Sequence, residues 1–136
     1  MEVIQNHNIN FNSMVENLVL VEKLVEDVCE EYKGNTDHYG NILVSLTEAV
    51  NNAILHGNKN DLSKKVNIEF IPKNGMLSFF VKDEGAGFDH TAIPDPTNPE
   101  NIEKLNGRGI FIMRHLTDSV FFHDKGSKVE LNFKMA

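Results

Sequence analysis

The chain has 136 residues, of which 40% are hydrophobic and 24% charged, as expected of one globular domain that buries its own core. Its 13 basic and 20 acidic residues give a formal net charge of −7, which argues against binding to the phosphate backbone of a nucleic acid. With one cysteine, no signal-peptide pattern and no apolar run of about 18 residues, we expect a cytoplasmic protein without membrane contact.

The first part of the chain predicts a short edge strand at most within residues 1–12, then an amphipathic helix over residues 13–32. Ser13 and Glu16 have the spacing of a capping box at its start. The apolar side chains that follow at intervals of four and three are Met14, Leu18, Val21, Val25, Val28 and Tyr32. Cys29 lies beside this stripe without a basic neighbour in the sequence, so we expect a buried and unreactive thiol.

A second helix is predicted from about residue 36 to His56, and Gly57 would end it. Its core-facing residues are Ile42, Leu46, Ala49 and Ala53, flanked by Leu43, Val50 and Ile54. A polar stripe runs along another side and consists of Ser45, Glu48, Asn52 and His56. Glu48 and Asn52 lie one turn apart, and such a pair can hold a hard cation together with a polar substrate. The alternative is that both residues only cap and solvate the helix.

The rest of the chain predicts two hairpins and a third helix over residues 109–117. The strands are expected over residues 64–71, 77–83, 120–123 and 129–133. Asn74-Gly75 and Lys125-Gly126 would form the two turns, and the proline-containing residues 89–106 would form a lid. This order predicts a two-layer α/β (α+β) sandwich with a mixed, mostly antiparallel sheet and helices on one face.

A glycine-rich acidic turn, Asp83-Glu84-Gly85-Ala86-Gly87, follows the second strand. Its glycines let a flat ring approach the backbone. A carboxylate at the strand end, Asp83, can accept a hydrogen bond from the exocyclic amino group of adenine and would reject the carbonyl of guanine. The alternative is an ordinary acidic turn.

A second pair of glycines opens the third helix in the sequence Asn106-Gly107-Arg108-Gly109. A helix N-terminus offers free N–H groups and a positive dipole end to phosphate oxygens, and Lys104 and Arg108 add cations nearby. The chain has neither the Walker loop nor the third glycine of the dinucleotide fingerprint. The alternative is an ordinary helix start.

These three motifs together resemble the boxes of the gyrase, heat-shock chaperone, histidine kinase and MutL (GHKL) ATPase superfamily. Residues 48–57 resemble its N box, residues 83–87 its first glycine box, and residues 107–109 its second. The short chain, the spacing of the boxes and the sequence of residues 107–113 resemble the anti-sigma-factor serine/threonine kinases (RsbW- and SpoIIAB-like). The resemblance spans residues 10–135 and implies one kinase domain, residues 1–136, with a Bergerat-type ATP-binding fold.

By this resemblance, Glu48 would be the catalytic base, Asn52 the Mg²⁺ ligand and Asp83 the adenine contact. Leu105 stands where some members carry an arginine, so Lys104 or Arg108 would have to contact the phosphates instead. The residues expected to shape the pocket and lid are Gly85, Gly87, Gly107 and Gly109. Ser127 stands where the family usually has a threonine near the adenine.

The implied activity is that of an Mg²⁺- and ATP-dependent serine/threonine protein kinase. It would phosphorylate a small anti-anti-sigma (STAS-like) regulator, bind a sigma factor or a similar partner, and form a homodimer. The alternative is a nucleotide-gated partner-binding module with little or no kinase activity. The presence of both Glu48 and Asn52 favours the kinase, because a binding module needs no base. A detached histidine-kinase module is disfavoured, since the chain has no His-Glu phosphoacceptor pair.

Overall fold

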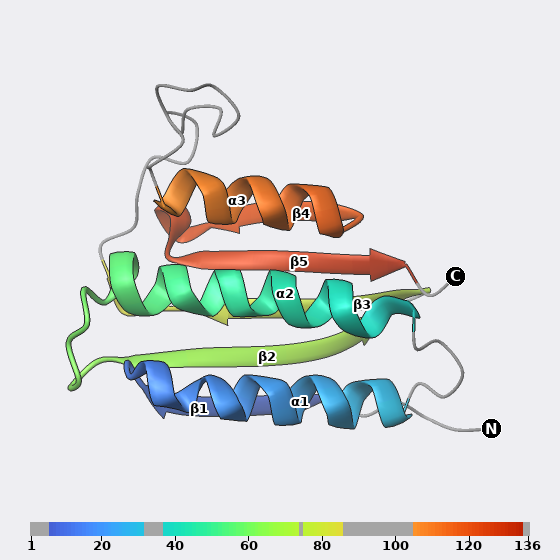
Figure 1. Cartoon of the computed structure of the whole chain (residues 1–136), viewed down its shortest axis with the longest axis horizontal. Coiled ribbons are helices and arrows are strands. Elements are labelled where there is room, and N and C mark those ends of the chain that lie inside the picture. Colours follow the sequence, from blue (N-terminus) through green and yellow to red (C-terminus); the bar gives the residue numbers. More distant parts are fainter. Residues whose placement is uncertain (1–5, 32–36, 74, 86–104, 135–136) are drawn as a thin grey trace.

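A five-stranded sheet forms one layer of the computed structural model, which describes residues 6–31, 37–73, 75–85 and 105–134 (Figure 1). The strands are β1 (His7–Asn12), β2 (Lys65–Lys73), β3 (Met76–Lys82), β4 (Ser119–His123) and β5 (Lys128–Lys134). Their order in the sheet is β1-β2-β3-β5-β4, and every neighbouring pair is antiparallel. The predicted hairpins are therefore confirmed, and the polar N-terminal segment forms an edge strand.

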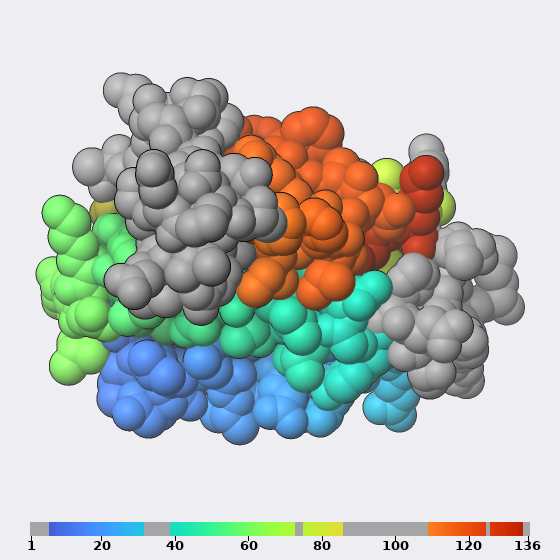
Figure 2. Space-filling view, turned by 45° about the horizontal axis from the view of Figure 1, so that its top comes forward, coloured from blue at the N-terminus to red at the C-terminus, as the bar shows by residue number. Residues whose placement is uncertain are grey.

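Within the described ranges, three α-helices form the second layer: α1 (Leu18–Glu31), α2 (Asp37–Asn52) and α3 (Leu105–Leu116). All three lie on the same face of the sheet (Figure 1). Figure 2 shows them side by side as one continuous surface, with α2 in the middle. The predicted two-layer sandwich is confirmed. In the described part of the chain, every helix is too short or too polar to span a membrane.

The alternation of apolar side chains along the strands explains how the layers pack. Val66, Ile68 and Phe70 of β2 are fully buried on the face that the helices cover. Across the strands, Phe70 packs on Phe79 with ring centroids 4.9 Å apart, and Phe79 meets Phe133 edge-on at 6.0 Å. This row of rings fixes the register of the three central strands, so that β3 ends and β5 begins beside α2.

The start of α1 differs from the prediction. Ser13 is buried, and its hydroxyl donates to the backbone carbonyl of Lys64 at 2.8 Å and accepts from Nδ2 of Asn58 at 2.7 Å. The first turn, Val15–Asn17, is a 3₁₀ turn without a side-chain cap. The predicted capping box is thus wrong, because partners far along the chain satisfy the serine hydroxyl.

Two other helix ends also differ from the prediction. A π-helical turn over Ala53–Gly57 follows α2, with the N–H of Asn58 bonded to the carbonyl of Ala53 at 2.7 Å. At the other helix, α3 begins at Leu105, four residues before the predicted start. The predicted lid therefore ends earlier than expected, and its residues 89–104 lie outside the described residues.

Cys29 is partly buried rather than fully buried, and it packs against the core. Burial raises the pKa of its thiol. A raised pKa keeps the thiol protonated at neutral pH, which is consistent with the expected lack of reactivity.

Candidate functional site

Three predicted site residues from distant segments line one pocket. Asn52 comes from the end of α2, Asp83 directly follows β3, and Ser127 directly precedes β5. The apolar wall consists of Ala49, Ala53, Val81, Met113, Phe122 and Val129. The pocket is a shallow hollow that spans about 300 Å³ when the open solvent at its mouth is included. Apolar walls with a few convergent polar groups suit a flat heteroaromatic ring.

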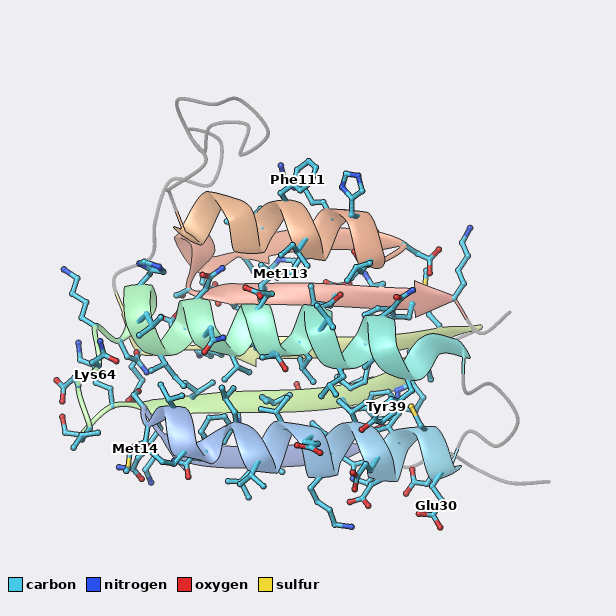
Figure 3. All side chains as sticks on the ribbon, viewed as in Figure 1. Met14, Glu30, Tyr39, Lys64, Phe111 and Met113 are labelled. Atoms are coloured by element: carbon cyan, nitrogen blue, oxygen red, sulfur yellow. The ribbon has the colours of Figure 1, made fainter. Side chains whose placement is uncertain are left out.

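α3 closes one side of this pocket with Met113, which is buried. Figure 3 shows Met113 on the side of α3 towards α2 and the sheet, whereas Phe111 points away from both. The two residues are separated by about half a helical turn, so a helix seated over the sheet has to direct them to opposite sides. Met113 belongs to the apolar face of α3 and also forms one wall of the pocket.

Asp83 is held in place by hydrogen bonds to the backbone. Its Oδ1 accepts from the N–H of Gly85 at 2.7 Å, and its own N–H donates to the carbonyl of Ser127 at 2.9 Å. The second bond ties the end of β3 to the start of β5, so the backbones of Asp83 and Ser127 are held side by side in the pocket wall. Only 7% of the Asp83 surface is exposed.

Burial raises the pKa of the Asp83 carboxyl, while the N–H of Gly85 and the charge of Lys64 partly oppose the shift. The ionised carboxylate is an acceptor only, with more acceptor sites than the single bond to Gly85 uses. A ligand that donates a hydrogen bond to the Asp83 carboxylate therefore replaces a hydrogen bond to water that was lost on burial. The amino group of adenine is such a donor, and the carbonyl of guanine is not.

Gly57 and Asn58 support the pocket lining, a role that the sequence analysis missed. A Cβ on Gly57 would collide with both carboxylate oxygens of Asp83, and a Cβ on Gly85 would collide with the carbonyl of Gly57. Asn58 is fully buried, donates to the carbonyl of Lys65 at 3.0 Å and accepts from the N–H of Glu84 at 2.7 Å. The end of the N box thus holds the first glycine box. The glycine at the helix end was the one available signal, and it was interpreted only as a stop.

Glu48 and Asn52 lie against the first turns of α3. A Cβ on Gly109 would stand 3.0 Å from Oε2 of Glu48 and 3.2 Å from Nδ2 of Asn52. Both side chains are half-buried, and the absence of a side chain at Gly109 lets the helix backbone come this close. The N box and the second glycine box therefore meet, and the N-terminal end of α3 faces the predicted phosphate side of the pocket.

The remaining predicted residues are distributed as follows. Gly107 and Arg108 lie in the first turn of α3, and the side chain of Arg108 is not described. Gly87 and Lys104 lie outside the described residues. The polar stripe of α2 is only partly open to solvent, because Ser45 is fully buried while His56 is exposed.

The residues at this site fit a magnesium ion that is held mainly through a nucleotide. In the described ranges, no group of three or more His, Cys, Asp or Glu could hold a metal by itself. Magnesium commonly takes one or two side-chain oxygens and completes its octahedron with phosphates and water. The carboxamide oxygen of Asn52, on the wall of the pocket and beside the start of α3, is a ligand of this kind.

The comparison with known families decides the assignment. The profile of the histidine kinase-like ATPase domain family matches residues 11–133. The chain belongs to this family. Its ligand is accordingly ATP, and the similar proteins described next place the chain in the anti-sigma-factor branch of the family.

Several curated relatives are anti-sigma F factors. The protein of Geobacillus stearothermophilus is 29% identical over 124 residues, which cover 89% of this chain and 84% of the relative. The protein of Clostridium perfringens is 34% identical over 100 residues, which cover 69% of this chain and 71% of the relative. The crystal structure of the RsbU and RsbW domains of a Mycobacterium tuberculosis protein matches with a TM-score of 0.67 at 14% identity. That match covers 96% of this chain but 32% of the longer one, and it supports the fold alone.

Proposed function

We propose that the protein is an Mg²⁺- and ATP-dependent serine/threonine kinase that phosphorylates a small STAS-like regulator and sequesters a sigma factor or a similar partner. One observation carries the proposal: residues of the N box, the first glycine box and the segment before β5 line a single pocket. The second glycine box adds support, because a Cβ on Gly109 would stand within 3.2 Å of both Glu48 and Asn52.

The position of each group suggests its part in the reaction. Asp83, a buried carboxylate on the pocket lining, accepts from the adenine amino group and orients the nucleotide. The triphosphate then extends towards the start of α3, where N–H groups and the helix dipole stabilise its negative charge. Asn52 would hold the magnesium ion, and the bound ion would neutralise phosphate charge.

Glu48 is assigned the role of general base. Its carboxylate lies beside Gly109, one helical turn from Asn52 and next to the predicted phosphate position. From there it accepts the proton of the attacking serine or threonine hydroxyl as the γ-phosphoryl group transfers to that oxygen. ADP leaves, and the acceptor protein carries the phosphate.

The assignment of a sigma-factor partner rests on the anti-sigma F factors to which the chain is similar, and the STAS-like acceptor rests on the resemblance of the three boxes. The homodimer rests on the resemblance of the three boxes, and it is measured by light scattering of the purified protein with and without Mg-ATP. A mass of one chain under both conditions would remove the dimer without affecting the kinase assignment.

The decisive experiment is transfer of labelled phosphate from ATP to candidate STAS-like proteins encoded nearby. We expect label on a serine or threonine of one of them with the wild-type protein and none with Glu48→Ala. Asn52→Ala should instead weaken the magnesium-dependent binding of ATP. A nucleotide-dependent complex that forms without any transfer would replace the kinase by a nucleotide-gated binding module.

A further inference from the structure

A buried hydroxyl on α2 lacks the hydrogen bond that such a group normally makes. Ser45 is fully buried, and among the residues that the structure describes its Oγ is the one buried side-chain atom without a partner. Buried polar atoms are almost always paired, and a serine inside a helix usually bonds the carbonyl four residues earlier. This serine does neither, so its hydroxyl remains available to a group that reaches it.

The position of Ser45 indicates which group that is. It lies on the same stripe of α2 as Glu48 and Asn52, and Gly109 shows that this stripe faces α3. Side chains on a helix lean towards its N-terminus, so the carboxylate of Glu48 leans over the turn that carries Ser45. Residues at this spacing are surface neighbours, with Cβ atoms about 5–6 Å apart.

We propose that Ser45 is a positioning residue for Glu48. Its hydroxyl donates a hydrogen bond to the Glu48 carboxylate once the nucleotide is bound, and this bond holds the carboxylate at the angle at which it receives the proton. An ionised carboxylate only accepts, and a serine hydroxyl can donate, so the pair is chemically matched. Catalytic hydrogen bonds often form only in the substrate complex, which accounts for the unpaired hydroxyl without ligand.

This inference depends on the proposed function, in which Glu48 is the base. ATP hydrolysis without an acceptor protein is a suitable readout, because Glu48 would then activate water and no partner has to be identified. The protein set is the wild type, Ser45→Ala, Glu48→Gln and the double variant. For each we would measure kcat and KM for ATP, together with the thermal melting temperature.

Ser78 provides a matched control in the same chain. It is also a fully buried serine, but its hydroxyl donates to Oδ1 of Asn132 at 2.6 Å. By the alternation of β3, it lies on the face of the sheet opposite to the helices. Ser78→Ala should lower the melting temperature and leave kcat unchanged, because it breaks a formed bond far from Glu48.

Ser45→Ala should behave in the opposite way. We expect kcat to fall about tenfold with KM unchanged, because the base is misplaced while the nucleotide still binds. The melting temperature should stay the same or rise by up to about 4 °C, because an unpaired buried hydroxyl is lost. In the Glu48→Gln background, Ser45→Ala should have no further effect on kcat.

The outcomes separate the two proposals. If Glu48→Gln abolishes hydrolysis and Ser45→Ala retains the wild-type kcat, the positioning role is wrong and the base survives. A loss of kcat for Ser45→Ala that persists in the Glu48→Gln background, or that accompanies a lower melting temperature, would also overturn the positioning role. If Glu48→Gln hydrolyses ATP like the wild type, Glu48 is not the base and both proposals fall.

Discussion

The two ends of the pocket are built differently. At the adenine end, the side chain and backbone of Asp83 are bonded to Gly85 and Ser127. At the phosphate end, the backbone of Gly109 lies beside Glu48 and Asn52, and neither side chain makes a hydrogen bond to another described residue.

This difference follows from what each end has to do. A group that recognises a rigid ring gains from being fixed in advance, because no ordering cost is left for binding. A group that takes up a proton or binds a cation has to keep its acceptor atoms free for the ligand. Substitutions at the two ends should therefore have different effects, and the predictions below separate binding from catalysis.

The largest effect is expected from Glu48→Gln. The amide keeps the size of the side chain but cannot take up the proton, so phosphate transfer should fall at least about a hundredfold. Binding of Mg-ATP should change little, because the adenine end is intact. Measurement of transfer rate alongside ATP affinity by calorimetry tests both statements. A variant that transfers phosphate at the native rate would exclude Glu48 as the base.

The adenine end is tested by the choice of nucleotide. Mg-ATP at a hundredfold excess over its Kd should stabilise the fold by about 2.7 kcal/mol. Mg-GTP should stabilise it much less, because the guanine carbonyl would face the Asp83 carboxylate. Thermal unfolding with each nucleotide provides the comparison. Equal shifts for ATP and GTP would remove the role assigned to Asp83.

Gly57→Ala tests the contact between the end of the N box and Asp83. The added methyl group has no room beside the carboxylate, so we expect a loss of about 1–3 kcal/mol in unfolding free energy together with weaker ATP binding. Gly40→Ala is the matched control, because a Cβ there meets nothing within 4 Å. In a helix it should stabilise by about 0.5–1 kcal/mol, and denaturant unfolding measures both variants. Equal effects would show that the Gly57 contact is unimportant.

The smallest expected effect is a change in how the stability of the ligand-free protein depends on pH. Because the pKa of Asp83 is raised above 3.8, the folded state binds more protons than the unfolded state between that value and the raised one. The contribution of Asp83 to the unfolding free energy should therefore decrease as the pH rises through this window. Asp83→Asn should remove this slope and make the ligand-free protein more stable at neutral pH than the wild type. Parallel pH profiles for the two proteins would contradict the burial effect.

Some features of this protein follow from the local sequence alone. Alternation in residues 66–70 and 129–133 identified buried strand faces, and the spacing from Ile42 to Ala53 identified the core side of α2. These patterns succeed because each element buries one face, and the period of its apolar residues records which one. The roles assigned to the carboxylate, carboxamide and glycine residues of the boxes also came from the sequence, and they stay predictions.

Other features were decided only by tertiary structure. Ser13 has the local signature of a cap but bonds Lys64 and Asn58 instead. Gly57 looked like a helix stop, and its contact with Asp83 exists only because β3 ends beside α2. The sequence placed Ser45 on the polar stripe of α2, but it did not predict that this residue is fully buried. Periodicity specifies which side of an element is covered, whereas the identity of the covering segment depends on contacts between residues far apart in the chain.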